Sequence, residues 1–259
     1  MSRIFCIAVL FISIINQGQG QSFTRISTGT QGIISPDLDD YWTGSAFVDL
    51  DNDLDLDIIM TNRTIGTSMR TNRVYENSNG LFIAKNNLIS NLGGFWFGVA
   101  CADYNNDDKK DCLVSGFSSS LFKGTGNFNF LKASGSIISN CGFSGISSAF
   151  ADLNNDGNLD FIEVRPNWLQ GPPCAGNPGG PHLMINDGPP NYTFSRNLDQ
   201  TLMSYGSDSY LHPYFIDFDD DGDQDLFIGM GIGMSKPDIA LRNRFTEDSV
   251  LSFEEITDQ

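Results

Sequence analysis

The chain alternates short apolar runs with polar, turn-forming stretches, with almost no helical periodicity. Four times, an apolar run is followed by an acidic stretch and then by a second apolar run. The first runs read GSAFV, FGVACA, SSAFA and PYFI, and the second runs read IIM, CLV, FIEV and LFIGM. Short apolar runs bounded by turn residues are typical of β-strands. Each acidic stretch is therefore expected to join two strands into a hairpin.

Two further candidate strands follow each hairpin. The third strands read RVYEN, SLFKG, HLMIN and IALRN, and the fourth read GLFIA, FNFLK, YTFSR and SFEEI. Four strands in a unit of about 50 residues, repeated along the chain, is the pattern of a β-propeller blade. The sequence therefore predicts an all-β fold, a β-propeller of four-stranded blades. Its four units span about 41–90, 95–139, 145–202 and 210–259.

The acidic stretches share a nine-residue pattern with oxygen-bearing side chains at places one, three, five and nine. We call them loops 1 to 4; they read DLDNDLDLD, DYNNDDKKD, DLNNDGNLD and DFDDDGDQD, and begin at Asp49, Asp103, Asp152 and Asp217. Alternating oxygen ligands on a tight loop suit calcium, whereas magnesium demands a tighter octahedron and keeps its waters. The alternative is a set of acidic turns that hold no metal.

These units resemble the FG-GAP or VCBS repeats of integrin α-chain heads and related secreted β-propellers, most literally at Phe97-Gly98 and the following DYNND. The resemblance covers residues 23–259. It implies up to four structural calcium ions, each bound by the side chains of places one, three, five and nine and the carbonyl of place seven. The implied ligands are Asp49, Asp51, Asp53, Asp55 and Asp57 in loop 1; Asp103, Asn105, Asp107, Lys109 and Asp111 in loop 2; Asp152, Asn154, Asp156, Asn158 and Asp160 in loop 3; and Asp217, Asp219, Asp221, Asp223 and Asp225 in loop 4.

The loops differ at place six, where the sharp turn favours glycine. Loops 3 and 4 have Gly157 and Gly222 there, whereas loops 1 and 2 have Leu54 and Asp108, which are disfavoured at positive φ. Two lysines inside loop 2 also lower its negative potential. We expect the fourth site to be the strongest, the third the next, and the other two weaker.

The repeat starts out of phase, because residues 23–34 resemble an extra outer, fourth strand. Five fourth-strand segments therefore accompany four hairpins, and the family's propellers usually have more blades. We expect an incomplete ring and a chain that is incomplete at its C-terminus. A compact ring of four or five blades and completion by a partner chain are the alternatives.

Residues 1–20 have the features of a signal peptide: Arg3, the apolar run 4–15, and small residues Gly18 and Gly20 before a cleavage site near Gln21. A signal anchor is the alternative. We expect a mature chain without a membrane span that is exported by this signal peptide, and is secreted or held at the cell surface.

Four cysteines remain after such a cleavage, an even number that suits an oxidising compartment. They are Cys101, Cys112, Cys141 and Cys174. The first two lie just outside the ends of loop 2, where the flanking strands should converge, which favours their pairing and leaves Cys141 for Cys174. Four free thiols are the alternative, because sequence does not define disulfide geometry.

The formal net charge of −17 argues against a nucleic-acid partner, whose phosphates would be repelled. An extracellular protein or a glycan is the expected partner. The dense carboxylate pairs all lie in repeated loops, and the two histidines, His182 and His212, accompany no serine elbow or cysteine–histidine signature. We therefore expect no enzyme activity; the less favoured alternative is a part of a polysaccharide-degrading enzyme.

Aromatic residues are the candidates for ligand binding. Trp42, Trp96 and Tyr210 each lie seven residues before place one of a loop, so they should lie on one face of the propeller, and Trp168 belongs to a Pro/Gly-rich insertion at 166–181. Packing between blades is the alternative for the first three. The leading hypothesis is an exported, calcium-binding β-propeller that acts as a binding or adhesion module; the alternative is a lectin or the scaffold domain of a polysaccharide-active enzyme.

Overall fold

The structure, a computed structural model, describes residues 32–33, 42–64, 70–133, 144–166, 181–206, 210–231 and 237–256, and of Trp42 only the main chain. The described residues form strands and two short helices. The strands are β1 (Trp42–Val48), β2 (Asp57–Asn62), β3 (Arg73–Ser78), β4 (Leu81–Ala84), β5 (Trp96–Ala102), β6 (Asp111–Gly116), β7 (Ser120–Gly126), β8 (Asn129–Lys132), β9 (Ser147–Ala151), β10 (Asp160–Val164), β11 (His182–Asn186), β12 (Phe194–Arg196), β13 (Tyr210–Ile216), β14 (Asp225–Met230), β15 (Ile239–Asn243) and β16 (Phe253–Glu255). The helices are α2 (Gln200–Ser204) and α3 (Phe245–Asp248).

The strands form four antiparallel sheets, each a meander of four consecutive strands. Sheet 1 is β1-β2-β3-β4, sheet 2 is β5-β6-β7-β8, sheet 3 is β9-β10-β11-β12 and sheet 4 is β13-β14-β15-β16. The all-β class and the four-stranded units predicted from the sequence are confirmed. Each acidic loop joins the first and second strands of its sheet, as expected.

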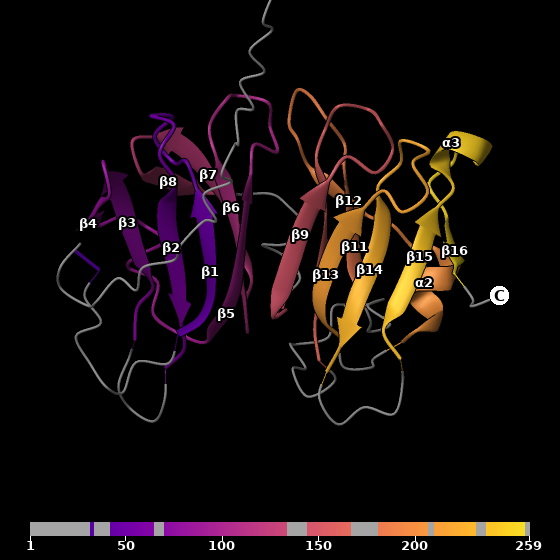
Figure 1. The fold of residues 1–259 in the computed structure, drawn as a ribbon, viewed down its shortest axis with the longest axis horizontal. Helices are drawn as coiled ribbons and strands as arrows, with labels where there is room; N and C mark the ends of the chain where they lie inside the picture. The colour runs from indigo at the N-terminus through magenta and orange to yellow at the C-terminus, as the bar shows by residue number, and fades with distance from the viewer. Residues whose placement is uncertain are drawn as a thin grey trace, which may run out of the picture.

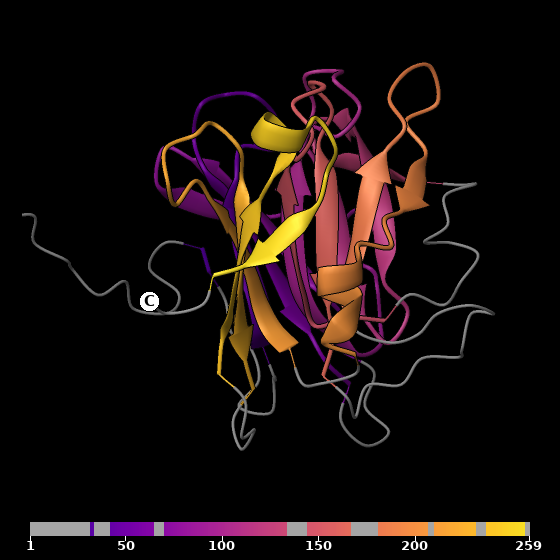
Figure 2. The same ribbon diagram turned by 90° about the vertical axis from the view of Figure 1, so that its right-hand side faces the viewer.

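The first strands lie side by side along the middle of the molecule, where β5 contacts β1 and β9, and β9 contacts β13. β4 and β16 lie at opposite sides (Figure 1). The second view, turned by 90°, shows sheets 3 and 4 in front, with the loops at their upper ends (Figure 2). The described residues do not form a closed ring.

Glycines allow the first strands to approach one another closely. A Cβ on Gly44 of β1 would lie 2.6 Å from the carbonyl oxygen of Phe97, and a Cβ on Gly98 of β5 would lie 2.4 Å from that of Ile146. Real Cβ atoms do not come so near a backbone oxygen. Gly98, part of the FG motif, therefore has a physical role in the contact between sheets 2 and 3.

Three apolar clusters fill the spaces between successive sheets. The cluster between sheets 1 and 2 contains Ile59 and Phe122, the one between sheets 2 and 3 contains Leu113 and Phe161, and the one between sheets 3 and 4 contains Ile162 among others. Sheets 2 and 3 thus pack both faces on neighbouring sheets, as strands with two apolar faces require, whereas sheets 1 and 4 each pack one.

The outer face of sheet 4 is exposed. Tyr214 and Ile216 of β13 are 55% and 51% exposed, and the Tyr214 ring contacts that of Phe227 with centroids 6.4 Å apart.

Neither helix in the described ranges has the length and apolar content needed to cross a membrane. The predicted signal peptide, and the predicted outer strand apart from residues 32 and 33, lie outside the described residues.

Candidate metal centre

A buried aspartate at place nine anchors each loop to its own sheet. One carboxylate oxygen accepts the main-chain N–H of place two and the other accepts an N–H from the third strand. In loop 4, Phe218 N donates to Asp225 Oδ2 at 2.8 Å and Asn243 N donates to Oδ1 at 2.7 Å. The other loops repeat both bonds at 2.7–3.1 Å. The place-nine residues, all 0% exposed, are Asp57, Asp111, Asp160 and Asp225.

The place-one carboxylate shapes the turn of each loop by accepting N–H groups from places five and six. In loop 4, Asp221 N donates to Asp217 Oδ1 at 3.2 Å and Gly222 N donates to Oδ2 at 3.1 Å. The same bonds recur in the other loops. The place-five Oδ1 in turn accepts the N–H of place seven in all four loops. One backbone frame is therefore built four times.

Two residues of each loop have left-handed backbone conformations. Place six has φ between +61° and +96°, and place four has φ between +53° and +65°. Place six is glycine only in loops 3 and 4. Place four is asparagine or aspartate throughout, the residue types that tolerate this conformation best after glycine. The place-four residues are Asn52, Asn106, Asn155 and Asp220.

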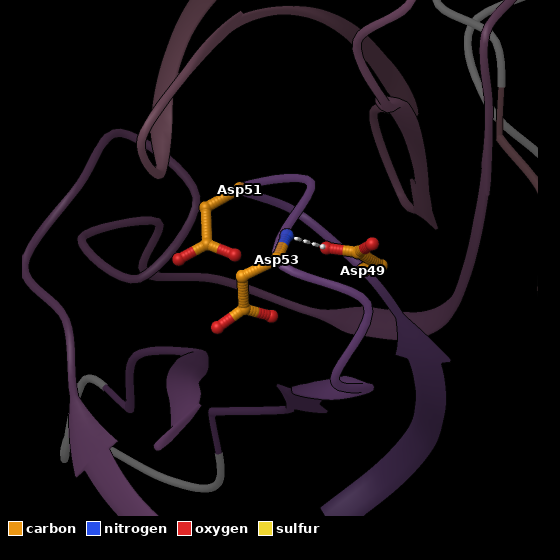
Figure 3. Close-up of side chains that lie close together, drawn as sticks. All are labelled: Asp49, Asp51 and Asp53. Carbon is orange, nitrogen blue, oxygen red and sulfur yellow. Dashed lines mark hydrogen bonds between the residues drawn. The ribbon is translucent and has the colours of Figure 1, made fainter. Parts of the chain in front are cut away.

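Acidic side chains converge in loops 1 and 4. Asp49, Asp51 and Asp53 each place one carboxylate oxygen within 4.8 Å of the others (Figure 3). Asp217, Asp219 and Asp225 do the same in loop 4. A further group joins loop 4 to α3 and consists of Asp221, Asp223 and Glu247. These clusters could hold a metal ion.

Unsatisfied side-chain oxygens lie in loops 1, 2 and 4. Asp51 Oδ1, Asn105 Oδ1 and Asp221 Oδ2 are buried atoms without a hydrogen-bond partner, and all three belong to place three or five. Buried acceptors normally have a partner, and a cation would supply one. Loops 1 and 4 therefore fit a hard cation. In loop 3, rotating the Asn154 amide would present its oxygen in place of the NH₂ that now donates to Asp156.

The electrostatics of the anchors also favour a cation. Burial raises the pKa of Asp57 and Asp225, and it raises the pKa of Asp111 and Asp160 to about 7. Neighbouring loop carboxylates add to the increase, while the two main-chain N–H bonds oppose it. A nearby positive charge favours the ionised carboxylates.

The place-seven carbonyls, of Asp55, Lys109, Asn158 and Asp223, remain predicted ligands. The Asp223 side chain has another role, because it is 1% exposed and accepts bonds from Asn155 and from Thr246 of α3. It therefore links loop 4 to loop 3 and to the helix.

The aromatic ligand site expected from the sequence is corrected for two of its residues. Trp96 is 8% exposed and packs in the core between sheets 1 and 2, and Tyr210 is 0% exposed, with its hydroxyl donating to the Tyr205 carbonyl at 2.7 Å. Neither ring is placed to stack on a ligand; both fill the space between sheets. The Trp42 side chain and all of Trp168 lie outside the described residues.

A disulfide joins Cys101 of β5 to Cys112 of β6, the pair favoured by the sequence. The two residues face each other across the strands that flank loop 2, with Cα atoms 4.2 Å apart. Cys141 and Cys174 lie outside the described residues.

The asparagines at or next to the end of three of the third strands were not singled out from the sequence, although RVYEN, HLMIN and IALRN repeat them. Their side chains bond to loop carbonyls, as described below for Asn186 and Asn243. Lys123 was also missed, because it lies outside the nine-residue pattern.

No protein-family model and no curated protein sequence matches this chain. The resemblance to FG-GAP or VCBS repeats therefore rests on the motifs alone.

Proposed function

We propose that this chain is an exported, calcium-stabilised β-propeller module that acts in binding or adhesion outside the cell. The observation that carries the proposal is the loop frame, built four times at the same end of four stacked sheets. Repetition favours a structural role for the ions over a catalytic one, since a catalytic centre needs a single specialised site. The calcium assignment is supported by oxygen-only ligands on a flexible loop.

The propeller assignment is supported by the arrangement of the sheets. Their first strands lie together at the middle, and successive sheets pack face to face through three apolar clusters. A rigid scaffold of this kind presents loops and rims to a partner. One concave surface of about 260 Å³ lies between sheets 2 and 3, and its lining includes Tyr104, Tyr192 and Lys132. Aromatic and charged groups of this kind suit a protein or glycan ligand.

Calcium should raise the melting temperature of the purified chain, and excess chelator should lower it. An ion that binds only the folded state adds about 2.7 kcal/mol per site at a concentration 100 times its Kd. Thermal unfolding followed by circular dichroism in calcium, magnesium and EDTA measures this effect, and calcium should stabilise more than magnesium.

The variant Asp51→Asn tests the assignment to the loops, because Asp51 carries an unsatisfied buried oxygen in loop 1. It should reduce the calcium-induced rise in melting temperature. Asp248→Asn, on α3, is the matched control and should leave the rise unchanged. Identical melting temperatures in calcium and in EDTA would refute the proposal.

A further inference from the structure

One position of the third strand faces the loop of its own sheet and differs in charge among the sheets. It directly precedes the residue whose N–H donates to the place-nine carboxylate, so the four positions are structurally equivalent. The residues are Glu76 in sheet 1, Lys123 in sheet 2, Ile185 in sheet 3 and Arg242 in sheet 4.

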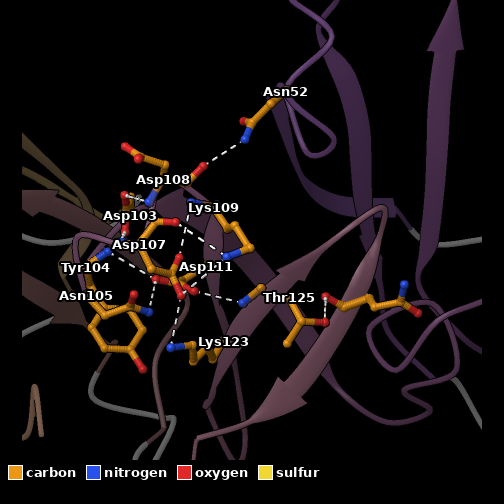
Figure 4. A network of polar contacts seen from close by, with 12 residues as sticks. Asn52, Asp103, Tyr104, Asn105, Asp107, Asp108, Lys109, Asp111, Lys123 and Thr125 are labelled. Carbon is orange, nitrogen blue, oxygen red and sulfur yellow. Dashed lines mark hydrogen bonds and ion pairs between the residues drawn. The ribbon is translucent and has the colours of Figure 1, made fainter.

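In sheet 2 this position brings an ammonium group into loop 2. Lys123 Nζ lies 3.0 Å from Asp107 Oδ2, and Lys109 Nζ lies 4.0 Å from the same oxygen. The other oxygen, Oδ1, accepts the main-chain N–H of Lys109 at 3.2 Å. The place-five carboxylate, an implied metal ligand, is thus satisfied by groups of the chain itself (Figure 4).

At place three of loop 2, the Asn105 amide nitrogen is bonded within the loop, while its Oδ1 has no hydrogen-bond partner among the described residues. The Asn105 amide nitrogen donates to Asp111 Oδ2 at 3.0 Å, which directs its NH₂ toward the place-nine carboxylate. Among the described residues, neither loop 2 nor loop 3 contributes to a convergent acidic group, so the ammonium of Lys123 is what distinguishes loop 2 from loop 3. Rotating the Asn105 amide would offer an oxygen, as in loop 3, but it would leave the ammonium in place.

Within the described ranges, no ammonium group pairs with place five of the other loops. In sheet 4, Arg242 Nε lies 2.8 Å from Asp219 Oδ2, at place three, but the carboxylates of loop 4 still converge. In sheet 1, Glu76 adds a negative charge, which pairs with Lys85. In sheet 3, Ile185 carries no charge. Loop 2 therefore differs from the others in the chemistry at its centre.

We infer that the Lys123 ammonium takes the place of the metal ion in loop 2, so that this loop holds its shape without a divalent cation while loops 1, 3 and 4 each bind one. The inference rests on the proposed calcium-binding function. A divalent ion entering loop 2 would have to displace an ion-paired ammonium and would be repelled by it. The resident lysine needs no free ion, so the stability of this loop does not depend on the calcium concentration.

Hydrogen exchange measured by mass spectrometry, on peptides that cover each loop, tests the inference with and without calcium. In the wild-type chain, calcium should slow exchange about tenfold or more in loops 1, 3 and 4, and less than about twofold in loop 2. In Lys123→Met, which removes the charge and keeps the length, loop 2 should exchange about tenfold faster in EDTA, and calcium should slow it. Lys132→Met, an exposed lysine on β8, is the control and should behave as the wild type.

A count of bound ions by native mass spectrometry needs no variant and covers the case in which Lys123→Met does not fold. The wild-type chain should bind three calcium ions. Four bound ions, or calcium-dependent protection of loop 2 in the wild-type chain, would overturn the inference and leave the proposed function standing. No bound ion and no loop that responds to calcium would instead overturn the proposed function.

Discussion

At the scale of single residues, Glu163 is a buried acidic group at a position where the other sheets are apolar. It lies on β10 and is 1% exposed, and neither carboxylate oxygen has a well-aligned hydrogen bond from the described residues. The equivalent positions of the other sheets hold apolar residues, namely Met60, Val114 and Ile228. Burial raises its pKa to about 7; the nearby hydroxyls of Ser119 and Ser115 and the charge of Arg165 only partly oppose this.

The raised pKa predicts that Glu163 makes stability depend on pH. The folded chain is most stable, with respect to this group, below the unfolded-state pKa of 4.5, where the Glu163 carboxyl is neutral in both states. As the pH rises toward 7 the unfolded state ionises first, so the free energy of unfolding should fall by roughly 3 kcal/mol. In Glu163→Gln, which stays neutral, urea unfolding between pH about 5 and about 8 should lack this fall.

The comparison is made at saturating calcium, so that the loop carboxylates titrate alike in both chains. Glu254→Gln serves as the control, because Glu254 has a 62% exposed side chain and should leave the pH profile unchanged. Parallel pH profiles for the wild type and Glu163→Gln would show that Glu163 is already ionised or hydrated in the folded chain.

The loop residues show what the sequence could and could not predict at this scale. The sequence predicted a positive φ at place six of each loop. In loop 1 this residue is Leu54, and its φ is +76°. The weaker affinity expected for loop 1 on account of Leu54 stays a prediction; the structure shows that its three carboxylates converge in spite of the unfavourable residue. The place-one carboxylate accepts the N–H of Leu54 at 3.0 Å, and this bond helps to hold the turn.

At the scale of elements, asparagines connect each loop to the next sheet. The place-four side chains donate along the series: Asn52 to the Asp108 carbonyl, Asn106 to the Gly157 carbonyl, and Asn155 to Asp223 Oδ1. The third-strand asparagines connect in the opposite direction, Asn186 to the Tyr104 carbonyl and Asn243 to the Leu153 carbonyl. The four loops therefore form one continuous polar layer.

Removing such a connection should cost more than removing a bond within one sheet. Asn243 is 0% exposed, and its amide donates to the Leu153 carbonyl at 2.9 Å and to the Gln224 carbonyl at 3.4 Å. Asn243→Ala leaves buried carbonyls unpaired and should lower the free energy of unfolding by about 2 kcal/mol. Chemical denaturation measures the loss.

Asn77, the equivalent residue of sheet 1, is the matched control. Its amide donates only to Leu56 of its own loop, at 3.2 Å in an exposed setting. Asn77→Ala should therefore cost less than about 1 kcal/mol. Equal losses in the two variants would show that the bond between sheets adds nothing.

The strands themselves were predictable, because the apolar runs and turn residues that define them are local. The bonds between loops could not be predicted, because they depend on how far each sheet is shifted along its neighbour. A repeated Asn near the end of the third strand is visible in the sequence, but its partner, a carbonyl in the loop of the neighbouring sheet, is not.

At the scale of the molecule, burial depends on which faces have a neighbouring sheet. The second residue after place nine lies on the same face of every sheet, and in sheets 1 to 3 it packs on the next sheet. It is Ile59, Leu113 and Ile162 in sheets 1 to 3, all at most 1% exposed, and Phe227 in sheet 4, on the exposed face. For Trp96 and Tyr210 the sequence left a ligand-binding rim and packing between blades open, because it shows their repeat but not the neighbouring sheet; the structure has the packing.

Equivalent substitutions on the buried and exposed faces should therefore differ in cost. Ile162→Ala, in the core between sheets 3 and 4, removes buried methyl groups and should lower the free energy of unfolding by about 2–5 kcal/mol. Ile216→Ala, on the outer face of sheet 4, removes a side chain that is 51% exposed and should cost less than about 1 kcal/mol. Urea unfolding of both variants at two protein concentrations measures these losses in the free energy of unfolding. A large loss for Ile216→Ala would contradict an open face in solution, and its growth with protein concentration would identify a second copy of the chain as the cover.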